Sequence, residues 1–152
     1  METDGGGKKQ KKYEYLYHIA DAKFRAFGLT LEESFENAAI ALFNVMIDTS
    51  NMKGIQERKI ELTSPDIKML LVEWLSELLY LFEVDEIIFS EFRIDKIEKK
   101  GEDFSLKGKA SGVPIDLLYH KFDTQVKAVT FHELEVEQDN KGGFWVQVVL
   151  DT

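Results

Sequence analysis

The sequence predicts an α+β fold in which two long, buried helices pack with mainly antiparallel β-sheet in β/α/β layers. Two segments, 30–48 and 64–82, have helical signals and are apolar on more than one side. The other segments alternate polar and apolar residues, which is the period of a strand. A helix that is apolar nearly all round needs cover on more than one face, so we expect both helices between layers of sheet.

Length and composition limit the class of protein. The 152 residues, with 44% hydrophobic residues, predict a single domain over residues 13–152 with a substantial core. The absence of cysteine removes disulfides and thiolate ligands and fits a reducing cytoplasm. No apolar run is long enough for a membrane span, so we expect a cytoplasmic protein. Residues 1–12, with three consecutive glycines and four lysines, predict a disordered tail.

The charge disfavours strong, direct nucleic-acid binding. The net charge is −9, and the tail carries a local excess of lysine, so the body is more acidic still. A surface of that sign repels phosphate backbones and suits hard cations or a basic protein partner. The lysine-rich tail could act as a weak nucleic-acid arm, although an unstructured tail is the simpler interpretation.

Local signals place the elements of the first half. Alternation predicts strands at 13–17, 23–27 and 59–62. Thr30 and Glu33 form a capping box that starts a helix running to about Asp48. Ser64 is expected to cap the second helix, with Pro65 in its first turn. Trp74 lies among leucines at helical spacing, so we assign it to the core.

The second half is predicted to be strand. Residues 91–110 form a hairpin around the turn at 100–103, and residues 112–116 interrupt the sheet. Strands at 126–132, 134–138 and 144–150 complete it.

Two acids at the ends of the folded body are the candidate site. Asp21 comes just after the first predicted strand, and Asp151 stops the apolar run of the last strand. If the strand ends meet, these carboxylates form a hard-cation site, and Thr152 can add only oxygens, which such cations accept. The alternative interpretation is that Asp21 caps a turn and Asp151 is a solubilising acid.

Several blocks of sequence resemble the archease family. They are His18-Ile-Ala-Asp21, the helix start from Gly28 through Thr30-Leu-Glu-Glu-Ser-Phe-Glu-Asn-Ala-Ala, Glu73-Trp-Leu-Ser-Glu-Leu-Leu-Tyr-Leu-Phe82, Lys127-Ala-Val-Thr-Phe-His132, and the hydrophobic ending at Asp151. Archeases activate the RtcB-type RNA ligase that seals tRNA halves during splicing. The resemblance implies that this protein promotes guanylylation of the ligase by GTP and supports multiple turnover. It also implies a divalent cation, calcium in the family, near Asp21 and Asp151.

The chain departs from the family pattern in three places. Ile19 stands where Thr is usual, Ala22-Lys23 where Gly is common, and Thr152 where an aliphatic residue is typical. Lys23 would weaken metal affinity unless its side chain points to the opposite face, which we expect strand alternation to allow.

Three further residues are possible functional groups. His18 could be a ligand or proton shuttle, or a structural histidine that holds the Asp21 loop, and His132 has the same two interpretations. Lys127 is predicted to share a face with Val129 and Phe131, where it either snorkels to solvent or reaches a nucleotide phosphate or a ligase carboxylate.

The sequence has no motif of an independent catalyst. A Gly-rich phosphate loop, a Gly-x-Ser-x-Gly and a His-Glu-x-x-His are all absent. We therefore assign no catalytic residue and expect an activator that meets GTP only through the ligase. A chaperone-like module for RNA-processing proteins is the second hypothesis, and a hydrolase using the same acids and metal is the third.

Overall fold

The computed structural model describes residues 10–16, 21–117 and 119–152. Along this part of the chain the elements are β1 (Tyr13–Leu16), β2 (Ala22–Gly28), α1 (Leu31–Met46), β3 (Gln56–Ser64), α2 (Ile67–Asp85), β4 (Ile87–Lys100), β5 (Asp103–Pro114), β6 (Ala128–Val129), β7 (Glu135–Gln138) and β8 (Phe144–Asp151). The first nine residues of the predicted tail lie outside the described residues.

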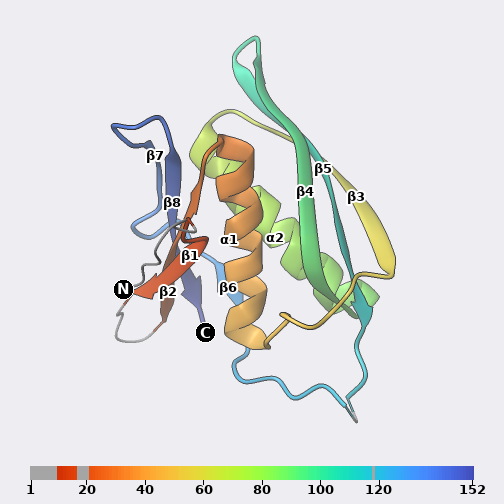
Figure 1. Ribbon diagram of the computed structural model, residues 1–152. Coiled ribbons are helices and arrows are strands. Elements are labelled where there is room, and N and C mark those ends of the chain that lie inside the picture. The colour runs from red at the N-terminus through yellow and green to blue at the C-terminus, as the bar shows by residue number, and fades with distance from the viewer. Residues whose placement is uncertain (1–9, 17–20, 118) are drawn as a thin grey trace.

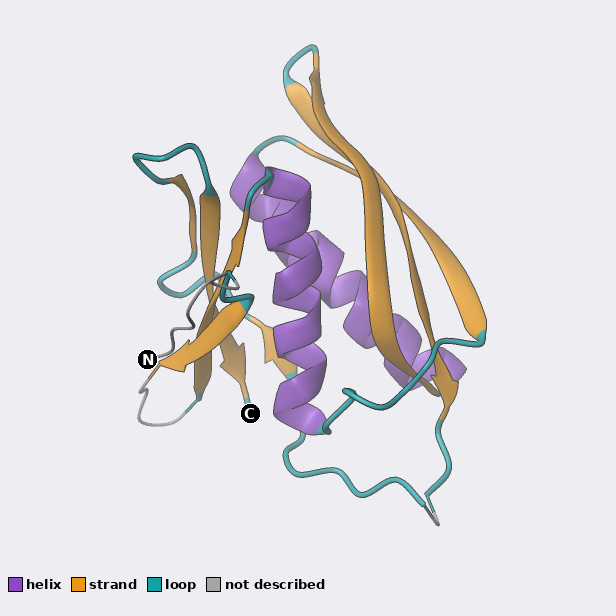
Figure 2. Ribbon diagram, viewed as in Figure 1, coloured by secondary structure: helices purple, strands orange, loops and turns teal. Residues whose placement is uncertain are grey.

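The two helices lie between two antiparallel sheets, which confirms the predicted α+β layers (Figures 1 and 2). One sheet has the order β1-β2-β8-β6, with β7 also paired to β8, and the other has the order β3-β5-β4. Helix α1 packs against β2 on one side and β4 on the other, and α2 packs against strands of both sheets. Among the described residues, no helix is long and apolar enough to cross a membrane.

The start of α1 is as predicted. The Thr30 hydroxyl accepts a hydrogen bond from the Glu33 N–H at 3.0 Å. The Glu33 carboxylate accepts from the Leu29 N–H at 2.6 Å, so two N–H groups at the helix end are satisfied reciprocally. The helix ends at Met46, two residues before the predicted end.

The predicted cap of α2 is wrong by two residues. Ser64 is the last residue of β3, and Asp66 is the N-cap, with its carboxylate accepting from the Met69 N–H at 2.8 Å. A carboxylate binds the helix start more strongly than a hydroxyl because it also interacts with the positive end of the helix dipole.

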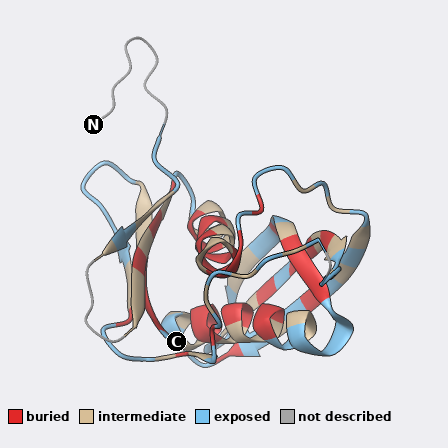
Figure 3. Ribbon diagram, turned by 90° about the horizontal axis from the view of Figure 1, so that it is seen from below, coloured by how far each residue is buried: buried red, intermediate tan, exposed pale blue. Residues whose placement is uncertain are grey.

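The core lies where the helices meet the two sheets, and buried residues line these faces (Figure 3). Trp74 is fully buried, as predicted, and its indole N–H donates to the Phe35 carbonyl at 2.9 Å, which joins α2 to α1. Its ring meets Phe92 of β4 edge-on, with the centroids 6.3 Å apart. Phe43 of α1 packs edge-on against Phe89 at 5.8 Å, so both helices are held to β4 by aromatic contacts.

Helix α1 also closes the open edge of β4. The Glu36 carboxylate accepts from the Ile94 N–H at 2.7 Å, and the Glu32 carboxylate accepts from the Ile97 N–H at 3.1 Å. The pairing of β4 with β5 is irregular between Ile94 and Lys96, so these N–H groups find partners on the helix. Burial raises the pKa of Glu36, because its charged form is partly removed from water.

Three strand predictions need correction. The strand predicted at 59–62 runs over Gln56–Ser64, and residues 112–114 continue β5 because Gly112 lets the chain pass the Ile88 carbonyl, which a Cβ would meet. The strand predicted at 126–132 is paired only at Ala128–Val129. It stops there because the Thr130 hydroxyl bonds to the Val149 carbonyl and to the His132 N–H, which begins a turn.

Candidate functional site

The pairing of β2 with β8 brings the two predicted acids to neighbouring positions. The last register pair is Ala22 with Leu150, so Asp21, just before β2, and Asp151, the last residue of β8, are the next residues along the two paired strands. With the register extended by this one step, their Cα atoms would be about 4.5–5.5 Å apart, which is within the reach of one ion shared by two carboxylates. Asp21 is half-buried and Asp151 is exposed. The start of β2 and the C-terminal end of β8 lie at the same end of the molecule (Figure 1).

The other side of β8 is held by β6. The Lys127 N–H donates to the Asp151 carbonyl at 2.8 Å, and Ala128 is the register partner of Asp151. The Thr130 N–H and hydroxyl both donate to the Val149 carbonyl, at 3.1 and 2.9 Å. These bonds fix the backbone on which the Asp151 side chain is carried, and Thr152 follows it, half-buried.

Lys23 does not lie on the face opposite to Asp151. Phe24 and Ala26 are buried, so Lys23 and Arg25 occupy the outer face of β2. Lys23 is the register partner of Val149, and Val149 and Asp151 are two residues apart in β8, so Lys23 and Asp151 share a face. The expectation that alternation separates Lys23 from the site is therefore wrong for Asp151. The Lys23 ammonium lies 2.6 Å from the Glu133 carboxylate, so its charge is taken up by an ion pair.

The remaining predicted residues surround this end in different ways. Lys127 is exposed, and the face it was predicted to share ends at Val129, because β6 ends there. His132 is exposed in the turn after β6, with its Nε2 atom 3.3 Å from the Glu133 carboxylate. His18 lies outside the described residues.

The donors at this end are oxygens, and they are few. In residues 10–16, 21–117 and 119–152, no group of three or more His, Cys, Asp or Glu side chains is arranged to hold a metal ion. Calcium takes about 6–8 oxygen ligands, and magnesium prefers carboxylates with several waters. Asp21 and Asp151, with main-chain oxygens and the Thr152 hydroxyl, fit such cations in kind and would leave several coordination positions to water or to a partner molecule.

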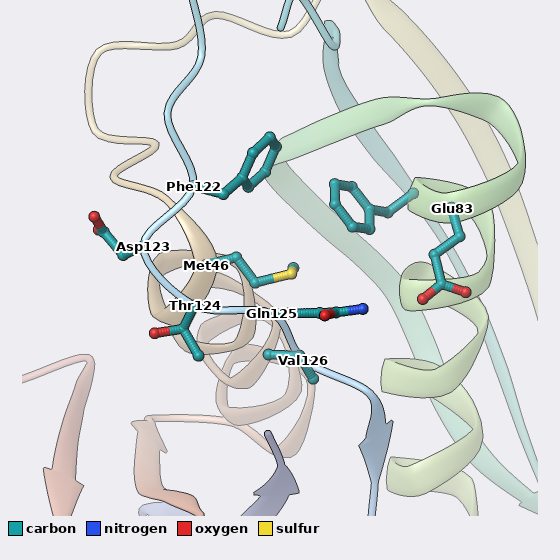
Figure 4. A pocket seen from close by; sticks show the side chains of 8 residues that line it. Met46, Glu83, Phe122, Asp123, Thr124, Gln125 and Val126 are labelled. Atoms are coloured by element: carbon teal, nitrogen blue, oxygen red, sulfur yellow. The ribbon is translucent and has the colours of Figure 1, made fainter.

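A second feature at this end escaped the sequence analysis. A cavity of about 380 Å³ lies between the C-terminal ends of α1 and α2 and the segment 119–127 (Figure 4). Val126 lines it, and the next residue, Lys127, is the one bonded to Asp151. Phe122 follows other apolar residues in the sequence, Leu117, Leu118 and Tyr119, and nothing in the sequence indicates which of these side chains line a cavity.

The fold and the candidate site together define a class of small α+β proteins. These have two helices between antiparallel sheets and a pair of acids where the start of β2 lies beside the end of β8. Residues 13–152 match the Archease protein family, and the chain belongs to that family.

Individual relatives agree with this assignment. The chain is 54% identical to the protein archease of Methanosarcina mazei over 141 residues, which cover 93% of this chain and 96% of the relative. It is 44% identical to the protein archease of Methanothermobacter thermautotrophicus, with 93% and 99% covered. The solution structure of Methanobacterium thermoautotrophicum protein 1598 superposes with a TM-score of 0.84 at 43% identity, covering 94% of this chain and 100% of that one. A crystal structure described as an archease, possible chaperone, from Thermotoga maritima has a TM-score of 0.51 at 18% identity, with 98% and 100% covered, and supports the fold alone.

Proposed function

We propose that this protein is an activator of an RtcB-type RNA ligase, and that it acts through a divalent cation, calcium in the first instance, held by Asp21 and Asp151. The observation that carries the proposal is the register of β2 with β8, because the two acids are the next residues after the last register pair although they are far apart in the sequence. Family membership supports the activator role, because archeases as a family are associated with this ligase.

The small number of donors suggests how activation works. Asp151 is exposed, so a cation bound there keeps coordination positions open toward a docked partner. A divalent cation offsets the charge of phosphoryl oxygens and helps to orient them. The role of this chain is to present the carboxylates on a rigid strand end, with the Lys127 N–H fixing the Asp151 backbone. Docking at the ligase active site would thereby favour transfer of guanylate to the ligase and release the enzyme for further turnovers.

The test compares Asp21→Asn and Asp151→Asn with the wild type in a ligase guanylylation assay with GTP. Asn keeps the size of the side chain and removes the charge that a hard cation needs. Asp95→Asn is the matched control, because Asp95 is an exposed acid in β4 on the other sheet. We expect both site variants to lose most of the stimulation and the control to keep it. Equal stimulation by all four proteins would remove the site claim.

A chaperone-like protein-binding module is the second candidate, and the exposed apolar side chains favour it. Leu29, Ile55, Tyr119 and Phe131 are between 60% and 78% exposed. The Thermotoga maritima relative carries the description "possible chaperone". A chaperone-like module should suppress the aggregation of an unfolded protein, and neither a chelator nor Asp21→Asn should change that suppression. An activator should stimulate the ligase, and both a chelator and Asp21→Asn should reduce that stimulation.

A further inference from the structure

The cavity near the two acids is lined by four apolar and four polar residues. The apolar part is formed by Met46 at the end of α1, Phe82 of α2, and Phe122 and Val126 of the segment 119–127. Its volume of about 380 Å³ falls in the range of sites that enclose a small molecule or a large side chain.

The cavity is preformed, because its wall is tied to both helices. The Asp123 N–H donates to the Met46 carbonyl at 2.7 Å, which caps the C-terminal end of α1 with the segment. The Phe122 ring packs against the Phe82 ring of α2, with the centroids 5.8 Å apart. An occupant would therefore not have to order this part of the chain in order to bind.

The electrostatics around the cavity favour a cation. Two helices end here, and neither has a basic residue in its last turn. A helix C-terminus carries about half a negative charge and is normally complemented by Lys, Arg or His. At the end of α2, the Arg58 guanidinium of β3 lies 2.9 Å from the Asp85 carboxylate and offsets part of this charge. The charged residues that line the cavity itself are both acidic: Glu83 and Asp123 lie on its two sides, and both are exposed (Figure 4). The lining therefore places negative charge beside the apolar part of the cavity.

One exposed apolar side chain lies beside the cavity. Tyr119, in the segment 119–127, is 78% exposed and lines a neighbouring hollow, and Asp123 lines both. This end of the molecule faces the viewer in Figure 3. An exposed aromatic side chain beside a pocket is typical of protein–protein contact sites.

We propose that the cavity is an anchor pocket for a partner protein, and that it receives an aromatic or long aliphatic side chain flanked by Lys or Arg. The apolar lining accepts the side chain, and Glu83, Asp123 and the two helix ends select the neighbouring positive charge. Val126 lines the cavity, and the N–H of the next residue, Lys127, is bonded to the Asp151 carbonyl, so the pocket and the predicted cation site are joined through adjacent residues. The inference rests on the proposed function in one respect: the partner that would present this segment is the ligase.

Two variants test the pocket without touching the acids. Gln125 is exposed and points across the cavity toward α2 (Figure 4), so Gln125→Trp fills the hollow. Glu83→Lys leaves the hollow open and reverses the charge beside it. The matched controls are Gln138→Trp at the end of β7 and Glu102→Lys in the β4–β5 turn, both exposed and outside this surface.

The measurement is the Kd for the purified full-length ligase, at two salt concentrations, with calcium binding to the free protein measured by calorimetry. We expect Gln125→Trp and Glu83→Lys to weaken ligase binding at least tenfold and to leave calcium binding within twofold of the wild type. Glu83→Lys should also reduce the salt dependence of binding, and both controls should bind as the wild type does. A thermal melt of each variant identifies any loss of fold.

The outcomes separate the two proposals. If Asp21→Asn abolishes stimulation while both pocket variants bind the ligase with wild-type Kd, the pocket inference is wrong and the proposed function stands. If the wild-type protein itself does not bind the ligase, the proposed function fails, and the pocket inference fails with it. Loss of binding in the controls as well as in the pocket variants would also overturn the inference, because the effect would not be local.

Discussion

Replacing Trp74 with Phe should destabilise the protein by about 3 kcal/mol. The substitution removes the indole N–H, which donates to the Phe35 carbonyl at 2.9 Å in the fully buried core. A buried hydrogen bond of this kind contributes about 1 kcal/mol. The change also removes roughly two buried ring carbons at about 0.8 kcal/mol each, and the unfilled space adds a smaller cavity cost.

Urea unfolding followed by circular dichroism measures this free energy, and the melting temperature should fall by about 10 °C. Trp145→Phe is the matched control. Trp145 is half-buried on the outer sheet face, where the Arg25 guanidinium lies 4.5 Å from its ring centroid. Phe keeps an aromatic ring beside Arg25, so this substitution should cost no more than about 1 kcal/mol, from a weaker cation–π contact and some lost burial. Equal destabilisation by the two substitutions would show that the contact between α1 and α2 does not have the central role assigned to it.

Three further predictions concern acids and the cation. Burial raises the pKa of Glu36, so the folded state favours its neutral form, and its contribution to stability should fall as the pH rises above the ordinary pKa of 4.5. In urea titrations, the free energy of unfolding of Glu36→Gln should therefore increase relative to that of the wild type as the pH is raised from 4.5. Asp66→Ala should lower the free energy of unfolding by about 1 kcal/mol, because it removes the N-cap of α2. Ser64→Ala should be nearly neutral, because in the described structure the buried Ser64 hydroxyl has no hydrogen-bond partner. A larger effect at Ser64 than at Asp66 would contradict the cap assignment. Calcium at about 100 times its Kd should stabilise the wild type by about 2.7 kcal/mol in a thermal-shift titration and leave Asp151→Asn unchanged.

The parts of the fold that were predicted correctly depend on neighbouring residues in the chain. The capping box at Thr30 requires only Glu33, three residues on, and the core position of Trp74 follows from the leucines around it. The strand predicted at 126–132 failed for the opposite reason. Its alternation was genuine, but pairing depends on β8, and of these residues only Ala128 and Val129 are paired with it. The Thr130 N–H and hydroxyl share the Val149 carbonyl, and the turn at His132 begins immediately afterwards.

One part of the candidate site could also be predicted from the sequence, and another part could not. That Asp21 and Asp151 would be near one another could be predicted, because Asp21 stands just before one strand and Asp151 at the end of another, and the start of one strand lies beside the end of its antiparallel neighbour. The cavity could not be predicted, because it forms where Phe122 from a loop meets the ends of two helices. The absence of basic residues from both last turns is visible in the sequence only after the helix ends are known.

The position of β8 between β2 and β6 has a consequence for folding. The β4–β5 hairpin joins segments adjacent in the chain, whereas bonds between β2 and β8, such as Arg25 to Gln147, close a separation of 122 residues. Closing so long a loop is entropically slow, so the hairpin sheet should form early and the β2–β8 sheet late. Partly folded molecules would then hold Asp21 and Asp151 far apart. An immature chain would thus lack the ion-binding end altogether, and only fully folded copies could engage a partner through it.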